Sequence, residues 1–302
     1  MSQRNDVLEK TTAPQGPEPK PPAEAEQDII EPLDAFLPPP EDFFDDELGP
    51  DRILGDVAMD TDAGESLLTS FGSNLNVVVI GATGAIGAAL TSRLQRDPAV
   101  SRIYAFSRRG AVTYGGNVVG GEIDLTQERS IERAATAVSA GGPVSLVIVA
   151  TGYLDQGDMD GPGDGWRALD GLDMANAFQI NTIGPSFAAK HFLPRMAEGR
   201  KALFAVLADR PAQPTTAAQY AYRASKAALD SVIRSLAGEL IDHGSGVLCA
   251  GLYPGAVDTT FSEPLLGDAE EEALSPEQAA ERIIRLADRT TPMDSGLVVA
   301  LE

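Results

Sequence analysis

A short apolar strand that runs directly into a glycine-rich turn is the feature that most constrains the fold of this chain. Residues 75–80 read Leu-Asn-Val-Val-Val-Ile, a β-branched run typical of a strand buried in a parallel sheet. Residues 81–87 follow as Gly-Ala-Thr-Gly-Ala-Ile-Gly, and Ile86, Leu90 and Leu94 then recur at helical spacing. This order of strand, turn and helix predicts an α/β fold, a Rossmann-type doubly wound parallel sheet with helices on both faces.

The glycine turn also predicts a nucleotide site. Glycines let the backbone approach phosphate groups, and the free N–H groups at the start of a helix favour an anion. The spacing here is G-x-x-G-x-x-G rather than G-x-G-x-x-G, and an ordinary tight strand-to-helix turn is the alternative. Because a strand precedes the turn and a helical pattern follows it, we interpret it as a dinucleotide site.

The end of the second expected strand, residues 102–106, bears on the choice of cofactor. Ser107, Arg108 and Arg109 follow this strand. Folds that bind NAD usually place an acid here against the ribose 2′-hydroxyl, whereas an arginine accommodates a 2′-phosphate. Two arginines without an acid favour NADP(H), with a pair of solvated surface arginines as the alternative.

Tyr222 and Lys226 form a Tyr-x-x-x-Lys step within a helical stretch downstream of the glycine turn. At this spacing both side chains lie on one helix face, so the ammonium can stand beside the phenol. A phenol titrates near pH ~10 when unperturbed, and a fixed positive charge is expected to lower the pKa of Tyr222. A tyrosine so placed can exchange a proton with an alcohol or a carbonyl. A solvated helix face is the alternative for the motif taken alone.

Further motifs follow in a consistent order, and together they carry a family resemblance. They are the glycine turn at 81–87, Asp-Leu-Thr at 124–126, Leu-Val-Ile-Val-Ala-Thr-Gly at 146–152, Ile-Asn-Thr-Ile-Gly-Pro at 180–185, Tyr-Arg-Ala-Ser-Lys-Ala-Ala-Leu at 222–229 and Tyr-Pro-Gly-Ala-Val-Asp-Thr at 253–259. From residue 74 to residue 302 the chain resembles the short-chain dehydrogenase/reductase family, and within it the C-factor-like carbonyl reductases. The resemblance implies an NADP(H)-dependent oxidoreductase that transfers a hydride between the nicotinamide and a small-molecule carbonyl or alcohol substrate.

The resemblance also implies roles for individual residues. Tyr222 would exchange the proton, Lys226 would lower the phenol pKa and hold the nicotinamide ribose, and Asn181 would support a water of the proton relay. Asp124 would contact the adenine. The full set expected to bind the cofactor is Gly81, Thr83, Gly84, Ala85, Ile86, Gly87, Ser107, Arg108, Arg109, Asp124, Leu125, Ala150, Thr151, Gly152, Tyr222, Lys226, Pro254, Gly255, Val257 and Thr259.

One position departs from the family pattern. Family enzymes end the fifth strand with a serine that hydrogen-bonds the substrate carbonyl, and Ala208 and Asp209 occupy the aligned positions here. An ionised Asp209 beside the phenol would raise the pKa of Tyr222 and oppose Lys226, and losing one donor to an oxyanion costs ~100- to 1000-fold in rate. Thr215 or Thr216, in the following loop, is the alternative source of the missing hydroxyl. A non-catalytic NADP(H)-binding sensor or interaction protein is therefore the competing interpretation.

Negative charge and proline concentrate in the first 74 residues, which hold 18 acids, 4 bases and ten prolines and carry −14 of the net charge of −22. We expect an acidic, proline-rich and largely disordered extension over residues 1–73, followed by a dinucleotide-binding domain over residues 74–302. Apolar residues set among the acids between Ile29 and Leu48 are typical of a segment that folds on a protein partner. A tail that packs on its own domain or stays solvated is the alternative.

Composition excludes several other functions. The excess of acids argues against nucleic acid and anionic membrane as partners. No apolar run reaches the ~18 residues of a membrane span, and the first residues lack the pattern of a signal peptide, so we expect a cytoplasmic protein; a homodimer stays open. No metal is expected. The aspartates at 155, 158, 160 and 164 resemble a calcium loop, but Pro162 and Leu169 stand where ligands belong.

Overall fold

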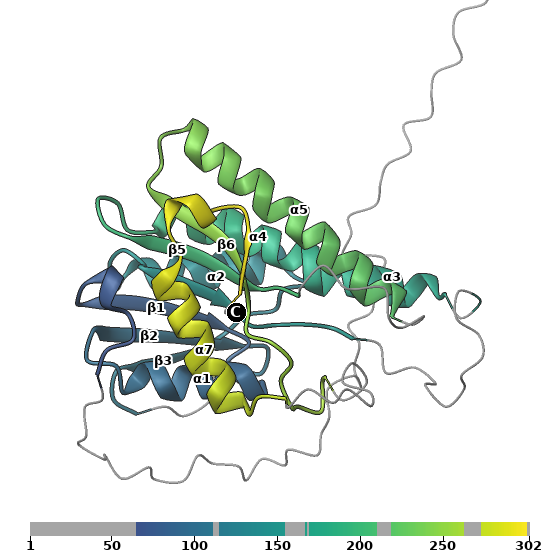
Figure 1. Ribbon diagram of the computed structural model, residues 1–302, viewed down its shortest axis with the longest axis horizontal. Coiled ribbons are helices and arrows are strands. Elements are labelled where there is room, and N and C mark those ends of the chain that lie inside the picture. Colours follow the sequence, from purple (N-terminus) through teal and green to yellow (C-terminus); the bar gives the residue numbers. More distant parts are fainter. Residues whose placement is uncertain are drawn as a thin grey trace, which may run out of the picture. The chain divides into compact units, whose positions relative to one another are not determined.

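The described part of the chain is built around one parallel sheet. A computed structural model describes residues 65–110, 115–154, 167, 169–209, 219–262 and 273–300, all within one compact unit, Asp46–Glu302. Seven strands lie in the order β3-β2-β1-β4-β5-β6-β7 (Figure 1), and neighbouring strands pair in parallel. The strands are β1 (Leu75–Ile80), β2 (Val100–Ser107), β3 (Val118–Glu122), β4 (Leu146–Val149), β5 (Ala202–Leu207), β6 (Val247–Tyr253) and β7 (Val298–Ala300).

Helices cover both faces of the sheet, which confirms the doubly wound Rossmann-type fold. Along β1, Val77 and Val79 belong to one core cluster and Val78 and Ile80 to the other, because successive side chains of a strand point to opposite faces. The first cluster includes α1 and α7; the second includes α2, α4 and α5. The helices are α1 (Ala85–Gln95), α2 (Glu128–Ser139), α3 (Gly171–Phe178), α4 (Gly184–Phe192), α5 (Tyr220–Asp242) and α7 (Pro276–Arg289).

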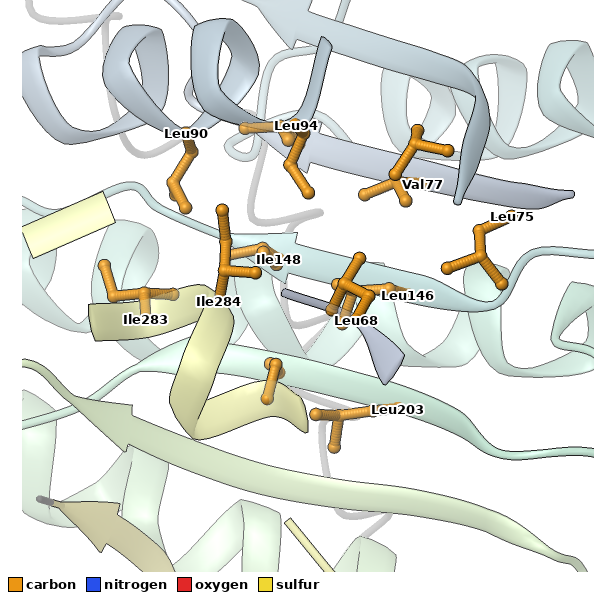
Figure 2. Packing of buried hydrophobic residues seen from close by; sticks show 14 of the residues in the cluster. Leu68, Leu75, Val77, Leu90, Leu94, Leu146, Ile148, Leu203, Ile283 and Ile284 are labelled. Atoms are coloured by element: carbon orange, nitrogen blue, oxygen red, sulfur yellow. The ribbon is translucent and has the colours of Figure 1, made fainter. Parts of the chain in front are cut away.

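The first core cluster joins the two ends of the described chain. Leu90 and Leu94 of α1 and Ile283 and Ile284 of α7 meet over the sheet (Figure 2), and each of these four side chains is fully buried. α7 begins at a local capping pattern. Ser275 is its N-cap and forms a reciprocal capping box with Gln278, with proline at the first helical position.

Residues 65–73 pack on the domain, although their composition groups them with the predicted extension. Leu67, Leu68 and Phe71 are buried in the first core cluster. The Ser70 amide donates to Oδ1 of Asp288 at 2.7 Å, close to the end of α7. Residues 65–73 therefore pack with the described part of the domain, while residues 1–64, with the predicted partner-binding segment, lie outside the described residues.

The order of the strands determines where a ligand can bind. The chain runs outward from β1 through β2 to β3 and then returns to β4 on the other side of β1. In open α/β sheets this reversal opens a crevice beyond the carboxyl ends of the two diverging strands. Gly81 follows β1 and Ala150 follows β4, so the predicted nucleotide turn lies at the reversal.

Candidate active site

Two of the three glycines of the turn are required by the protein itself. Gly81 has φ +92°, and a Cβ there would lie 2.8 Å from the carbonyl oxygen of Ala150. At Gly87 a Cβ would lie 2.0 Å from the carbonyl oxygen of Gly81. A side chain at either position would collide with backbone, so these glycines bring β1, β4 and α1 into close contact.

At Gly84, the middle glycine of the turn, no contact within the protein requires the absence of a side chain. A Cβ on Gly84 would meet only the Gly81 carbonyl oxygen, at an ordinary 3.5 Å. Gly84 is the N-cap of α1 without a side-chain cap, and Thr83, Gly84 and Ala85 are exposed. The first amides of a helix lack intrahelical partners and attract anions. The arrangement therefore fits a phosphate group bound at the exposed start of α1. Ile86, the next residue, is half-buried and packs against the first core cluster.

The end of β2 brings cations to the same edge of the sheet. Arg108 and Arg109 are exposed, whereas Ser107 is buried and its Oγ donates to the Gly110 carbonyl at 3.1 Å. Partial burial lowers the pKa of Arg108; the charge of Asp124 opposes this and that of Arg109 adds to it. The two arginines and Asp124 therefore lie close enough to interact electrostatically.

Asp124 is held by its own loop. Its Oδ1 accepts hydrogen bonds from the Thr126 amide at 2.9 Å and the Thr126 hydroxyl at 2.8 Å, and its amide donates to Ser130 Oγ at 3.0 Å. Leu125 beside it is buried. This Asx-type turn fixes the loop after β3 next to the arginines.

The end of β4 supplies an unsatisfied polar group. The Thr151 hydroxyl is buried and has no hydrogen-bond partner among the described residues, and its methyl carbon is 3.0 Å from where a Cβ on Gly81 would stand. Buried hydroxyls are ordinarily hydrogen-bonded. The orphan hydroxyl beside the nucleotide turn therefore fits a group supplied by a ligand.

Asn181 fixes the loop after β4 to the helix that carries the tyrosine. Its Oδ1 accepts from the Tyr153 amide at 2.7 Å, and its Nδ2 donates to the Tyr153 carbonyl at 2.8 Å and to Ser225 Oγ at 2.9 Å. It lies in a π-helical segment, η4 (Gln179–Ile183), between α3 and α4. Such segments are frequent at functional sites, and here the side-chain amide acts as a structural clamp.

α5 places the tyrosine and the lysine together, as the spacing predicts. Tyr222 is buried, and Lys226 Nζ is 5.7 Å from the centroid of its ring. The ammonium also donates to the carbonyl of Leu207 at the end of β5, at 3.0 Å. Burial lowers the pKa of Lys226, and the charge of Asp209 opposes that change.

The pKa of Tyr222 shifts in the direction opposite to the one expected from Lys226. Burial, first, and then the charge of Asp209 and its hydrogen bond with the phenol raise this pKa well above its ordinary value. Tyr253 contributes in the same direction. The opposing effect anticipated for an aspartate at this position is confirmed.

The segment after β6 is held by α7, by Leu274 and by its own hydrogen bonds. Arg282 of α7 donates to the Pro254 carbonyl at 2.9 Å, and Gly255 has φ +104°. Val257 bridges to Leu274, and Thr259 Oγ1 bonds to Ser262 Oγ at 2.7 Å. Sequence patterns did not single out Arg282, which holds the Pro254 carbonyl, or Tyr253, which acts on the pKa of Tyr222. Both effects depend on contacts between distant segments.

Some predicted positions lie outside the described residues. These include the aspartates at 155, 158, 160 and 164, and the alternative hydroxyls Thr215 and Thr216. In the described part of the chain, no three metal-ligating side chains gather in one place, and no helix there is long and apolar enough to cross a membrane.

The fold and this edge of the sheet define the class of protein. Gly81, Gly84, Arg108 and Thr151 follow strand ends at the reversal of a parallel sheet, and the Tyr222–Lys226 pair stands on α5. The chain therefore has a Rossmann-type fold with a candidate dinucleotide site and a candidate proton donor.

Comparison with known proteins narrows this class to a family. The model of the short chain dehydrogenase family matches residues 75–269. A 1-hydroxy-2-glutathionyl-2-methyl-3-butene dehydrogenase of Rhodococcus sp. (strain AD45) is 30% identical over 225 residues, covering 73% of this chain and 93% of the relative. The chain therefore belongs to the short-chain dehydrogenase family and is an oxidoreductase, whose family binds a nicotinamide cofactor.

Two further comparisons agree with this assignment. C-signal of Myxococcus xanthus is 31% identical over 161 residues, covering 51% of this chain and 87% of the relative, which confirms the C-factor-like resemblance. The crystal structure of NADPH-bound carbonyl reductase from chicken fatty liver superimposes with a TM-score of 0.62 at 21% identity, covering 78% of this chain and 95% of that one. At this identity the structural match shows the fold.

Proposed function

We propose that this chain transfers a hydride between NADP(H) and a carbonyl or alcohol substrate, with Tyr222 exchanging the proton. The observation that carries the proposal is the pairing of buried Tyr222 with Lys226 on α5. The carbonyl reductase with the same fold holds NADPH, and the Rhodococcus relative is named as the dehydrogenase of a hydroxy compound. Both are consistent with this chemistry.

The proposed cofactor contacts follow the edge of the sheet. The exposed first turn of α1, around Gly84, would receive the pyrophosphate, and Arg108 and Arg109 would pair with a 2′-phosphate. The orphan hydroxyl of Thr151 is suited to hydrogen-bond the cofactor. The other residues proposed to line the site are Gly81, Thr83, Ala85, Ile86, Gly87, Ser107, Asp124, Leu125, Ala150, Gly152, Pro254, Gly255, Val257 and Thr259.

The chain's own residues would manage the proton. The bound reduced cofactor supplies the hydride to the carbonyl carbon. Tyr222 then gives its hydroxyl proton to the carbonyl oxygen, so the product is an alcohol and the phenol is left as phenolate. Lys226 stabilises that phenolate by its charge, and Asn181 holds the helix and loop in place. A proton from solvent restores Tyr222.

A second candidate function is a protein that binds NADP(H) without turning over a substrate. The hydrogen bond between Asp209 and Tyr222 favours it, because the phenol proton is held by a protein carboxylate where the family has a serine. An ionised carboxylate beside a developing oxyanion is repulsive, which slows carbonyl reduction. This candidate has the same cofactor contacts but lacks turnover.

Two measurements separate the candidates. Calorimetric titration gives the affinities for NADPH and NADH, and a panel of aliphatic and aromatic carbonyl compounds is then screened for NADPH oxidation. Binding with turnover supports the oxidoreductase proposal. Tight NADPH binding with no turnover across the panel favours the binding protein, and absence of nucleotide binding contradicts both.

A further inference from the structure

The ring of Phe261 occupies the space between the end of β4 and the candidate proton donor. Its centroid is 6.2 Å from that of Tyr222, with the ring planes inclined at 66°. Its tip, Cζ, lies 3.0 Å from the position that a Cβ on Gly152 would take. The glycine thus leaves room for the ring, and the edge-to-face contact with the phenol is a favourable aromatic geometry.

A hydrogen-bonded turn holds this ring in place. The Ser262 amide donates to the Thr259 carbonyl, and the Thr259 amide donates to Ser262 Oγ, both at 3.1 Å. Ser262 Oγ also donates to the carbonyl of Val257. Asp258 and Leu274 extend the anchoring through a backbone hydrogen bond of 2.8 Å. Phe261 is therefore positioned by a turn that is tied to the strand end.

The position of the ring conflicts with the proposed reaction. Hydride and proton must reach the carbon and oxygen of one carbonyl group, so the nicotinamide has to come close to the Tyr222 hydroxyl. Phe261 lies against Gly152 and Tyr222, which are both in the proposed cofactor set. A ring between these two residues would compete with a nicotinamide bound against them.

We propose that Phe261 is an autoinhibitory plug: its ring closes the nicotinamide end of the site in the free chain and withdraws when the complete cofactor binds. This inference rests on the proposed function, because it assumes that the site receives a nicotinamide nucleotide. The adenosine end is untouched, since the first turn of α1 and Arg108 are exposed. The plug therefore opposes one half of the cofactor only.

The fraction of molecules in which the plug is closed sets how much it weakens NADPH binding. Suppose that only a fraction of the free molecules is unplugged. For a ligand that binds the unplugged form alone, the apparent Kd then equals the intrinsic Kd divided by that fraction. A plug closed in nine of ten molecules weakens NADPH about tenfold. Adenosine 2′,5′-bisphosphate carries the adenine, ribose and 2′-phosphate but no nicotinamide, so its affinity is independent of the plug.

The test compares the two ligands by calorimetry on the full chain and on Phe261→Ala. We expect NADPH to bind about tenfold more tightly to Phe261→Ala, and adenosine 2′,5′-bisphosphate to bind both proteins within about twofold. Phe261→Leu is the second variant, because it keeps an apolar side chain in the turn but loses the ring that reaches Gly152; it should also bind NADPH more tightly. Met293→Ala is the matched control, because Met293 is 85% exposed and its loss should change neither affinity.

Each outcome is decisive. Equal changes in the affinities for both ligands would overturn the plug, because the ring would then support the whole site. Weaker NADPH binding in both Phe261 variants would also overturn it, because the ring would then contact the bound nicotinamide favourably. Unchanged NADPH affinity in folded Phe261→Leu would overturn it as well. If adenosine 2′,5′-bisphosphate binds and the NADPH difference is absent, the plug fails while the proposed cofactor stands. If neither ligand binds any of these proteins, both fail.

Discussion

The phenol of Tyr222 is hydrogen-bonded to the carboxylate of Asp209, the residue that follows β5 by two positions. Burial, the negative charge and this hydrogen bond all stabilise the neutral phenol, so the pKa of Tyr222 is raised. Lys226 stands on the same helix face, but its ammonium donates to the Leu207 carbonyl. The proton on Tyr222 is therefore firmly held, and replacing Asp209 should weaken that hold.

Replacing Asp209 should accelerate carbonyl reduction. Asp209→Ser removes the charge and supplies a neutral hydroxyl to the substrate oxygen, and we expect a rise in kcat of about 100-fold, the lower range for one oxyanion donor. Asp209→Asn is the matched control: it removes the charge at nearly constant volume without adding a hydroxyl, and so separates the effect of the charge from that of the hydroxyl donor. Steady-state kinetics on the best carbonyl compound would measure both. Equal or slower turnover in Asp209→Ser would contradict the role assigned to this carboxylate.

The same variants should differ in their pH dependence. Alcohol oxidation needs the phenolate as base, so its rate rises with pH toward the pKa of Tyr222, which is raised in the parent. Removing Asp209 lowers this pKa, and the rising limb should therefore move to lower pH in Asp209→Asn and Asp209→Ser. Profiles of kcat for alcohol oxidation would show the shift. A shift to higher pH, or none, would argue against the electrostatic coupling.

Tyr222→Phe should abolish turnover without removing the cofactor. The ring, and with it the contact to Phe261, is retained, but the proton donor is lost, so we expect kcat to fall at least ~100-fold while the Kd for NADPH changes little. Tyr220→Phe is the control, since that tyrosine is 40% exposed and precedes the motif. Turnover that survives Tyr222→Phe would refute the proposed mechanism.

Cofactor choice should depend on the arginines after β2. With Arg108 intact, NADPH should bind more tightly than NADH; Arg108→Glu should reduce or invert the difference, because a carboxylate repels the 2′-phosphate and accepts from the ribose hydroxyl of NADH. Arg93→Glu, with the same change of charge in the last turn of α1, should leave the ratio unchanged. Calorimetry supplies the ratio, and equal parent affinities would remove the basis for the NADP(H) assignment.

Truncation should locate the start of the folded domain. A chain beginning at Glu65 should keep its thermal midpoint and NADPH affinity, whereas one beginning at Ser73 loses buried Leu67, Leu68 and Phe71. Burial of one such side chain contributes ~1.5–3 kcal/mol, so the shorter chain should be at least about 3 kcal/mol less stable by denaturant unfolding. Equal stability of the two chains would contradict the packing observed here.

Local patterns predicted much of the fold. The apolar runs of β1 and β4 and the glycine turn into α1 depend on residues close in sequence, and each is present. The pairing of Tyr222 with Lys226 follows from helical spacing alone. Such features are readable because their physical cause lies within a few residues.

Long-range contacts were not readable in the same way. The direction of the pKa shift of Tyr222 depends on how deeply α5 is buried and on where Asp209 points, neither of which the sequence expresses. The contact of Phe261 with Gly152 joins loops after β6 and β4. Ser70 binds Asp288 across 218 positions of the chain, so the packing of residues 65–73 has no local signature.

The contacts between Ser70 and Asp288 and between α1 and α7 bear on how the chain acquires its structure during synthesis. β1 is the first of the described strands to leave the ribosome, yet the apolar face beside it is completed by Ile283 and Ile284 of the last described helix. Contacts of such sequence separation form late and slow folding. The nascent domain therefore keeps this face uncovered until α7 has emerged, a period in which we expect chaperones to bind it.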